Sequence, residues 1–154
     1  MNTKTTIFIG SDHTGTLLKQ YLIQKLSAKY NIIDLGVEIG VKTSDYPLIA
    51  QKVAINVVKN KNNFGIVICG TGQGVMIAAN KINGIRCGYG NNLLNAQLIR
   101  AHNNANMIAL GARIIANYYA YSIVNAFLTT KFLQNRHLRR VNQIKKIEIE
   151  NDNQ

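Results

Sequence analysis

The chain has 154 residues, of which 47% are hydrophobic and 16% are charged. These values exclude an intrinsically disordered chain and suit one domain, residues 1–154, with a hydrophobic core of its own. No apolar run approaches the roughly 20 residues that a bilayer requires, so we expect no membrane-spanning helix.

Basic residues dominate the charge. Eighteen Lys and Arg residues stand against seven Asp and Glu residues, which gives a formal net charge of +11. Such an excess indicates an anionic partner, such as a phosphorylated metabolite, an acidic surface or a nucleic acid. The basic residues are spread along the chain without interleaved aromatic residues, so a nucleic-acid-binding module is the remote alternative.

The two cysteines, Cys69 and Cys87, lack the spacing of metal ligands. The N-terminus leads directly into a short apolar run, without the long apolar region of a secretory signal. Both observations indicate a reduced compartment, and we expect the protein in the cytoplasm.

Short apolar runs alternate with longer helical patterns from one end of the chain to the other. We expect strands at residues 6–9, 32–35, 64–69, 85–89 and 107–110. Their apolar residues are continuous rather than alternating, which is typical of a sheet covered on both faces. Apolar residues at helical spacing predict helices around residues 17–26, 48–53, 75–81, 94–98 and 120–128. This order predicts a three-layer α/β/α sandwich with a five-stranded, mainly parallel, Rossmann-like sheet.

The C-terminal segment predicts a helical extension. Apolar residues recur every three positions over residues 138–147, and Asn135 is a candidate N-cap. Arg136 and Arg140 would project from the same side of this helix, either as a fork for a phosphate or as a solvated basic face. The polar residues 148–154 are expected to fray.

The third expected strand ends in the clearest chemical signal of the sequence. Ligands of open α/β sheets bind beyond the carboxyl ends of the strands, and this strand ends in Cys69. The glycine-rich loop 70–74 follows, and its backbone N–H groups can approach a ligand or hold an oxyanion. The pattern predicts either a reactive thiol or a buried structural cysteine beside a tight turn.

Polar residues also flank the first and last expected strands. Asp12 and His13 follow the first strand, where Asp12 either binds sugar hydroxyls or caps the next helix. His102 precedes the last strand, in a loop where a lone histidine is more often structural than catalytic, and Arg113 follows that strand. His137, beside two arginines, belongs either to a phosphate cluster or to the solvated surface. The histidines lack paired ligand spacing, so we expect no metal.

Seven segments, in this order, resemble the ribose-5-phosphate isomerase B family and the wider ribose/galactose isomerases. They are GSDHTG at 10–15, SDYP at 44–47, ICGTGQG at 68–74, AANKINGIR at 78–86, HNNAN at 102–106, LGAR at 110–113 and NRHLRRV at 135–141.

The resemblance implies interconversion of ribose 5-phosphate and ribulose 5-phosphate in the pentose phosphate pathway, without metal or cofactor. It implies that Cys69 is the general base between C1 and C2, with Thr71 beside it, and that His102 assists ring opening. The implied binding residues are Asp12 and Asn103 for the sugar, Tyr46 for the lining, Gly70, Gly72 and Gly74 for the enediolate, and His13, Arg113, Arg136 and Arg140 for the phosphate.

The resemblance also implies a homodimer, or a dimer of dimers, whose active site is shared between subunits. The chain departs from the family at three places. After residues 84–86 the family usually has a cysteine followed by one or two acidic residues before the next helix, and this chain has Gly90-Asn91-Asn92 there. The common Ser-Ala of the family is Asn95-Ala96, and the Gly-Gly that often precedes the final Arg-His is Gln134-Asn135. These departures affect the expected rim of the pocket and leave galactose 6-phosphate or allose 6-phosphate as alternative substrates. A single chain with the base, the ring-opening residue and the phosphate residues favours ribose 5-phosphate.

Overall fold

The computed structural model describes residues 5–153 and contains one five-stranded parallel sheet with the strand order β2-β1-β3-β5-β4. The strands are β1 (Thr6–Ser11), β2 (Asn31–Asp34), β3 (Phe64–Cys69), β4 (Cys87–Tyr89) and β5 (Met107–Gly111). The helices are η1 (His13–Gly15), α1 (Thr16–Leu26), α2 (Tyr46–Val57), α3 (Gln73–Ala79), α4 (Leu93–Ala101), α5 (Asn117–Thr129) and α6 (Asn135–Asp152). Within residues 5–153, no helix is both long and apolar enough to cross a bilayer.

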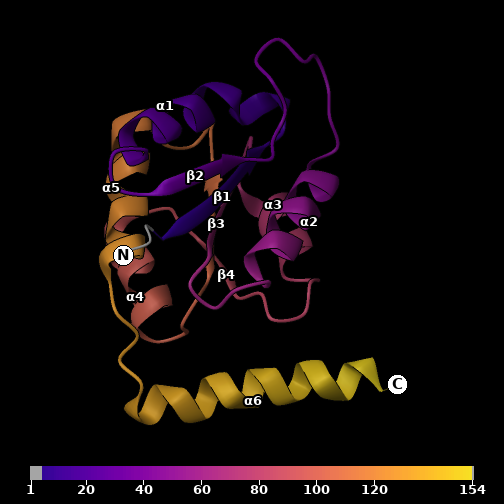
Figure 1. Cartoon of the computed structure of the whole chain (residues 1–154), viewed down its shortest axis with the longest axis vertical. Coiled ribbons are helices and arrows are strands. Elements are labelled where there is room, and N and C mark those ends of the chain that lie inside the picture. The colour runs from indigo at the N-terminus through magenta and orange to yellow at the C-terminus, as the bar shows by residue number, and fades with distance from the viewer. Residues whose placement is uncertain (1–4, 154) are drawn as a thin grey trace.

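Helices cover both faces of the sheet (Figure 1). Helices α1, α4 and α5 pack on one face, where Ile66 and Ile68 of β3 belong to the same buried cluster as Phe127 of α5. Helices α2 and α3 cover the other face, where Val67 of β3 packs in a second buried cluster with Val53 of α2. Alternate residues of β3 thus enter opposite layers, as period-two geometry requires. The predicted three-layer sandwich is confirmed.

The fourth strand is shorter than the sequence predicted. It begins at Cys87 rather than at residue 85. The N–H of Ile85 closes a turn onto the carbonyl oxygen of Ile82 at 3.1 Å, and the N–H of Arg86 donates to Oδ1 of Asn106 at 2.9 Å. Both N–H groups therefore bond outside a strand ladder, and pairing starts one residue after Arg86.

Helix α6 lies beside the sandwich rather than in one of its layers (Figure 1). Its N-cap is Gln134, so the prediction of Asn135 as N-cap is wrong: Asn135 is already the first helical residue. The helix continues to Asp152, past residue 148, from which the chain was expected to fray. Glu148 accepts the N–H of Gly84 at 2.8 Å, and Asp152 accepts the side-chain amide of Asn83, so the loop before β4 holds this end. Residue 154 lies outside the described residues.

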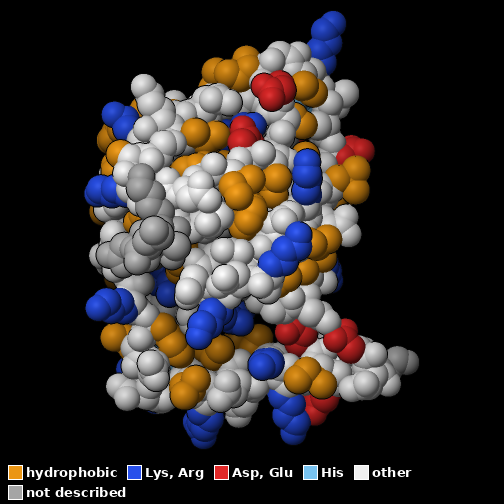
Figure 2. All heavy atoms as spheres, viewed as in Figure 1, with side chains coloured by type: hydrophobic (Ala, Val, Ile, Leu, Met, Phe, Trp, Pro, Cys, Tyr) orange, Lys and Arg blue, Asp and Glu red, His pale blue; other side chains and the backbone are white. Residues whose placement is uncertain are grey.

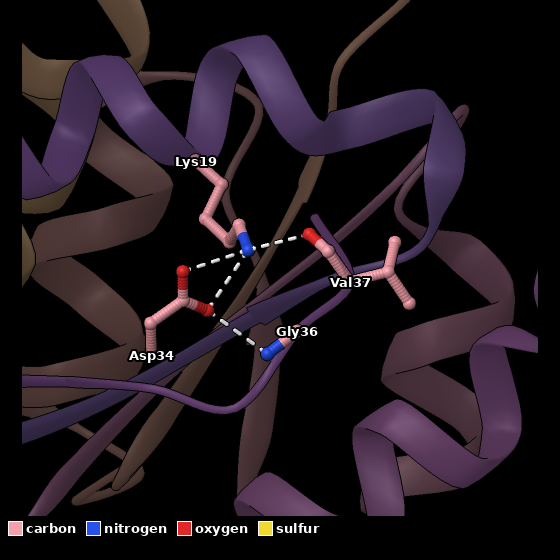
Figure 3. A network of polar contacts seen from close by, with 4 residues as sticks. All are labelled: Lys19, Asp34, Gly36 and Val37. Carbon is pink, nitrogen blue, oxygen red and sulfur yellow. Dashed lines mark hydrogen bonds and ion pairs between the residues drawn. The ribbon is translucent and has the colours of Figure 1, made fainter. Parts of the chain in front are cut away.

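Lys19 of α1 is a buried cation that fixes the chain after β2 (Figure 3). Its side chain is 1% exposed, and Nζ lies 2.9 Å and 2.8 Å from the two carboxylate oxygens of Asp34. Nζ also donates to the carbonyl of Val37 at 2.7 Å, while Asp34 accepts the N–H of Gly36 at 2.9 Å. The network therefore anchors the start of the loop that leads to α2.

We expect Lys19→Met to lower the free energy of unfolding by about 2–4 kcal/mol, because Asp34 and the Val37 carbonyl would lose their charged partner. Urea unfolding followed by circular dichroism measures this change. The same substitution at the exposed Lys52 of α2 is the control and should stay within about 0.5 kcal/mol of wild type. Equal, small effects of both substitutions would contradict an anchoring role for Lys19.

Candidate active site

The carboxyl ends of β1, β3 and β5 meet at one edge of the sheet. Ser11 pairs with Ile68, and Cys69 pairs with Gly111. The N–H of Asp12 donates to the carbonyl of Ile68 at 3.1 Å, so the chain after β1 remains beside the end of β3. The segments that follow these three strands therefore share the edge at which open α/β sheets bind ligands.

Cys69 lies where the apolar core meets the glycine loop. It is the last residue of β3, is 5% exposed, and belongs to the cluster under α2 and α3. Its Sγ accepts the N–H of Gly72 at 3.2 Å. Gly72 has a φ of +82°, and a Cβ there would lie 2.8 Å from the Tyr89 ring and 2.9 Å from the Leu110 carbonyl carbon. Glycine thus permits the close approach that brings an amide to the sulfur.

Loop 70–74 is bordered by the chain that follows β5. The N–H of Arg113 donates to the carbonyl of Gly70 at 2.9 Å. A Cβ on Gly70 would lie 3.4 Å from Cδ and Nη1 of Arg113, so the arginine side chain lies over this glycine. Thr71 and Arg113 are both exposed, and Oγ1 of Thr71 accepts the N–H of Gln73 at 3.4 Å. A hydroxyl and a guanidinium therefore flank the thiol and remain accessible to a ligand.

Tyr46 brings the N-terminus of α2 to the same loop. A Cβ on Gly74 would lie 2.6 Å from Cε2 and Cζ of Tyr46, so the ring rests against the backbone at the start of α3. Tyr46 is 40% exposed, and Pro47 follows it in the first helical turn, where proline is favoured. The segment from β2 to α2 thus forms a side wall of the site.

Asp12 and His13 are fixed by neighbouring groups at this edge. Asp12 caps η1, because Oδ1 of Asp12 accepts hydrogen bonds from the backbone N–H of Thr14 at 2.9 Å and from the Thr14 hydroxyl at 2.5 Å. The capping role predicted as one alternative is present. The N–H of Ser44 donates to Nδ1 of His13 at 3.2 Å, and the N–H of His13 donates to Oγ of Ser44 at 2.9 Å. Because Nδ1 accepts, the neutral ring carries its proton on Nε2, which can donate to an anion.

A second group of predicted site residues gathers around α6. His102, the C-cap of α4, stacks on His137 with ring centroids 4.1 Å apart and an interplanar angle of 8°. His137 is 7% exposed, which excludes the solvated surface, one of the two alternatives for this residue. Burial of its ring, together with His102, Arg136 and Arg140, lowers the pKa of His137. The two arginines remain exposed beside it. Val141, four residues after His137, is also buried and lies on the same face of the helix. An apolar residue at this spacing is the sequence signal that could have predicted the burial of His137.

The two groups of residues lie at opposite edges of the sheet. His102 and the exposed Asn103 precede β5, whereas Arg113 follows it. The five residues of β5 span about 13 Å from first to last. One copy of the chain therefore does not bring its Cys69 and its His102 to the same small ligand.

The remaining candidates are the second cysteine and a possible metal site. Cys87 begins β4 and is buried, and burial raises the pKa of its thiol. Among residues 5–153, no three His, Cys, Asp or Glu side chains cluster in the way that a metal ion would need.

Comparison with known proteins places this fold and this set of motifs in one family. The Ribose/Galactose Isomerase family model matches residues 7–144. Ribose-5-phosphate isomerase B of Escherichia coli is 40% identical over 143 residues, which cover 92% of this chain and 95% of that protein.

Solved structures agree with the sequence comparison. Ribose-5-phosphate isomerase B from Mycoplasma genitalium, crystallised with bound ribulose-5-phosphate, matches with a TM-score of 0.93 and 40% identity over 97% of this chain and 99% of that chain. The Clostridium thermocellum enzyme matches with a TM-score of 0.90 and 42% identity, over 94% of this chain and 98% of that chain. The chain therefore belongs to the ribose/galactose isomerase family.

Proposed function

We propose that the chain interconverts ribose 5-phosphate and ribulose 5-phosphate. The observation that carries this proposal is the match, over 97% of the chain, to a relative crystallised with bound ribulose-5-phosphate. The carboxyl edge of the sheet supports it, because the Cys69 thiol, the backbone amides of loop 70–74 and the Arg113 guanidinium lie close together there. The pentose phosphate pathway and the cytoplasm, its expected context, remain predictions from the sequence.

Cys69 is the base that moves the carbon-bound proton. In the open-chain aldose the thiolate removes the proton from C2 and returns it to C1, while the hydroxyl proton moves from O2 to O1. The aldehyde thus becomes an alcohol and C2 becomes a ketone. The enediolate between these states carries negative charge on oxygen, which the N–H groups of loop 70–74 stabilise. Thr71, exposed beside the loop, has a hydroxyl suited to the O2-to-O1 transfer.

The rest of the edge binds the substrate. Asp12 and Tyr46 contact the sugar, and the Nε2 proton of His13 and the guanidinium of Arg113 contact the phosphate. A phosphate is a remote anchor, and its binding energy positions the reacting carbons at the thiol.

A second copy of the chain completes the site. The edge that carries Cys69 lacks His102, Asn103, Arg136 and Arg140, because these residues lie at the far edge of the same chain. In a twofold dimer the far edge of one copy meets the near edge of the other, which produces two equal sites. We therefore propose a homodimer with shared sites, alone or paired into a tetramer.

Apolar surface around α6 supports this dimer. Ile144, Ile147 and Ile149 are 45%, 58% and 52% exposed. A cavity of about 660 Å³ lies between α6 and the sandwich, lined in part by Ile85 and Ile144 (Figure 2). Apolar surface of this kind is typical of a protein interface. Basic side chains on the face shown in Figure 2 are scattered rather than aligned, which favours a small anionic substrate over a nucleic acid.

We expect Cys69→Ala to lower kcat in both directions by roughly 1,000-fold, because no other group would move the carbon-bound proton. Assays in EDTA with ribose 5-phosphate and with ribulose 5-phosphate measure this loss. Cys87→Ala is the matched control: it changes the other buried cysteine and should retain activity in protein that remains folded. Full turnover by the Cys69 variant would refute the assignment of the base.

We expect His102→Gln to impair ring opening but to leave proton transfer by Cys69 intact. Ribose 5-phosphate closes through its C4 hydroxyl into a furanose, whereas ribulose 5-phosphate has no hydroxyl placed to close a stable ring on C2. Interconversion should fall about 100-fold in both directions, because the equilibrium constant fixes the ratio of the two kcat/KM values. Exchange of the C1 proton of ribulose 5-phosphate with deuterium from the solvent needs no ring opening and should change at most about threefold. A proportional loss of this exchange would exclude a ring-opening role for His102.

Mixed dimers test the shared site. Cys69→Ala and His102→Gln subunits, unfolded together and refolded, should recover about a quarter of wild-type activity on ribose 5-phosphate. Half of the dimers would be mixed, and each mixed dimer would contain one intact site. If both residues act within one chain, the mixture recovers nothing. Either variant refolded alone is the control.

A further inference from the structure

Two arginines hold the loop that carries His102 and Asn103. Arg86, directly before β4, donates from Nε to the carbonyls of Asn103 and Asn104, both at 3.1 Å. Its Nη2 donates to the Asn104 carbonyl as well, at 2.9 Å. One guanidinium thus fixes two successive peptide groups, and the first of them belongs to Asn103.

Arg100 holds the same turn from the other side. Its Nη1 donates to Oδ1 of Asn104 at 2.8 Å and to the carbonyl of Ala105 at 2.7 Å. Its guanidinium carbon lies 5.0 Å from the ring centroid of Phe64 and 5.9 Å from that of Phe127. Asn104 has a φ of +48°, a left-handed conformation that turns the chain. Arg86 therefore bonds two backbone carbonyls of the turn, and Arg100 bonds the Asn104 side chain and the Ala105 carbonyl.

The backbone of Arg86 is itself tied to the end of this loop. Its N–H donates to Oδ1 of Asn106 at 2.9 Å, and its carbonyl accepts the N–H of Asn106 at 3.1 Å. The side-chain amide of Asn106 donates to the carbonyl of Gly84 at 2.8 Å. Burial lowers the pKa of Arg86 while the nearby Glu148 raises it, and an arginine remains charged at neutral pH. The guanidinium is thus a charged donor on a fixed base.

We propose that Arg86 is a positioning residue for His102 and Asn103. The inference rests on the proposed isomerase function. Hydrogen bonds from charged donors are short and directional. The guanidinium of Arg86 therefore sets the orientation of the Asn103 carbonyl group and, through the chain, the position of the preceding residue, His102. His102 must reach the ring oxygen of a furanose held by another copy of the chain. A small displacement of the loop would therefore impair ring opening more than proton transfer by Cys69.

A comparison of interconversion with proton exchange tests this role. Arg86→Met keeps the aliphatic stem and removes all donors, and should lower kcat/KM for interconversion roughly 10- to 100-fold. Exchange of the C1 proton of ribulose 5-phosphate with deuterium from the solvent, which needs no ring opening, should stay within about threefold of wild type. Arg86→Lys keeps a cationic donor for the Asn104 carbonyl and should recover part of the loss. Arg139→Met, the same change at an exposed arginine of α6, should match wild type.

Three results would overturn the proposal. The first is an equal loss of interconversion and of C1 proton exchange by folded Arg86→Met, which would indicate a general disturbance of the site. The second is wild-type kinetics in both Arg86 variants. The third is failure of both variants to fold, judged by circular dichroism, because Arg86 would then serve the fold alone. A wild-type protein that isomerises neither substrate would instead refute the proposed function.

Discussion

Loop 70–74 crosses the end of β5 at a distance that only glycines allow. A Cβ on Gly111 would lie 2.6 Å from the carbonyl oxygen of Thr71, and a Cβ on Gly72 would lie 2.9 Å from the carbonyl carbon of Leu110. This contact turns the Gly72 amide toward Sγ of Cys69 and keeps the loop at the carboxyl edge of the sheet. The thiol of Cys69, the amides of loop 70–74 and the guanidinium of Arg113 lie together because the backbone of this loop packs directly against the backbone at the end of β5.

The rest of the edge is built by anchoring loops onto this contact. Lys19 fixes the chain after β2, and the loop that follows ends at Ser44, which orients the ring of His13, and at Tyr46, which covers Gly74. The Lys19–Asp34 ion pair joins a buried cation to a carboxylate that is 33% exposed, and such a pair adds little net stability. Its value here lies in holding one conformation of a loop whose own residues are largely exposed.

The opposite edge has a different construction. Stacked imidazoles join the end of α4 to α6, and arginine forks hold the turn at Asn104. The stacked imidazoles need no hydrophobic core, which suits a helix that lies beside the sandwich with most of its residues exposed. The division of the site residues between the two edges makes assembly of two copies part of the chemistry that we propose, because neither edge alone has both a base and a ring-opening group.

The sequence by itself determined the layers and the order of the motifs, because continuous apolar strands and helical periodicity are local patterns. It also predicted Cys69, the glycine loop and several arginines as site residues through their likeness to a family. It did not reveal the burial of His137, the ordered helix up to Asp152 or the late start of β4, because each depends on partners distant in sequence: His102, Asn83 and Asn106. The hydrogen bonds of Arg86 were equally hidden, since their acceptors are backbone carbonyls, which no residue type reveals. Tertiary structure decided these features, because only the folded chain determines which donor meets which acceptor.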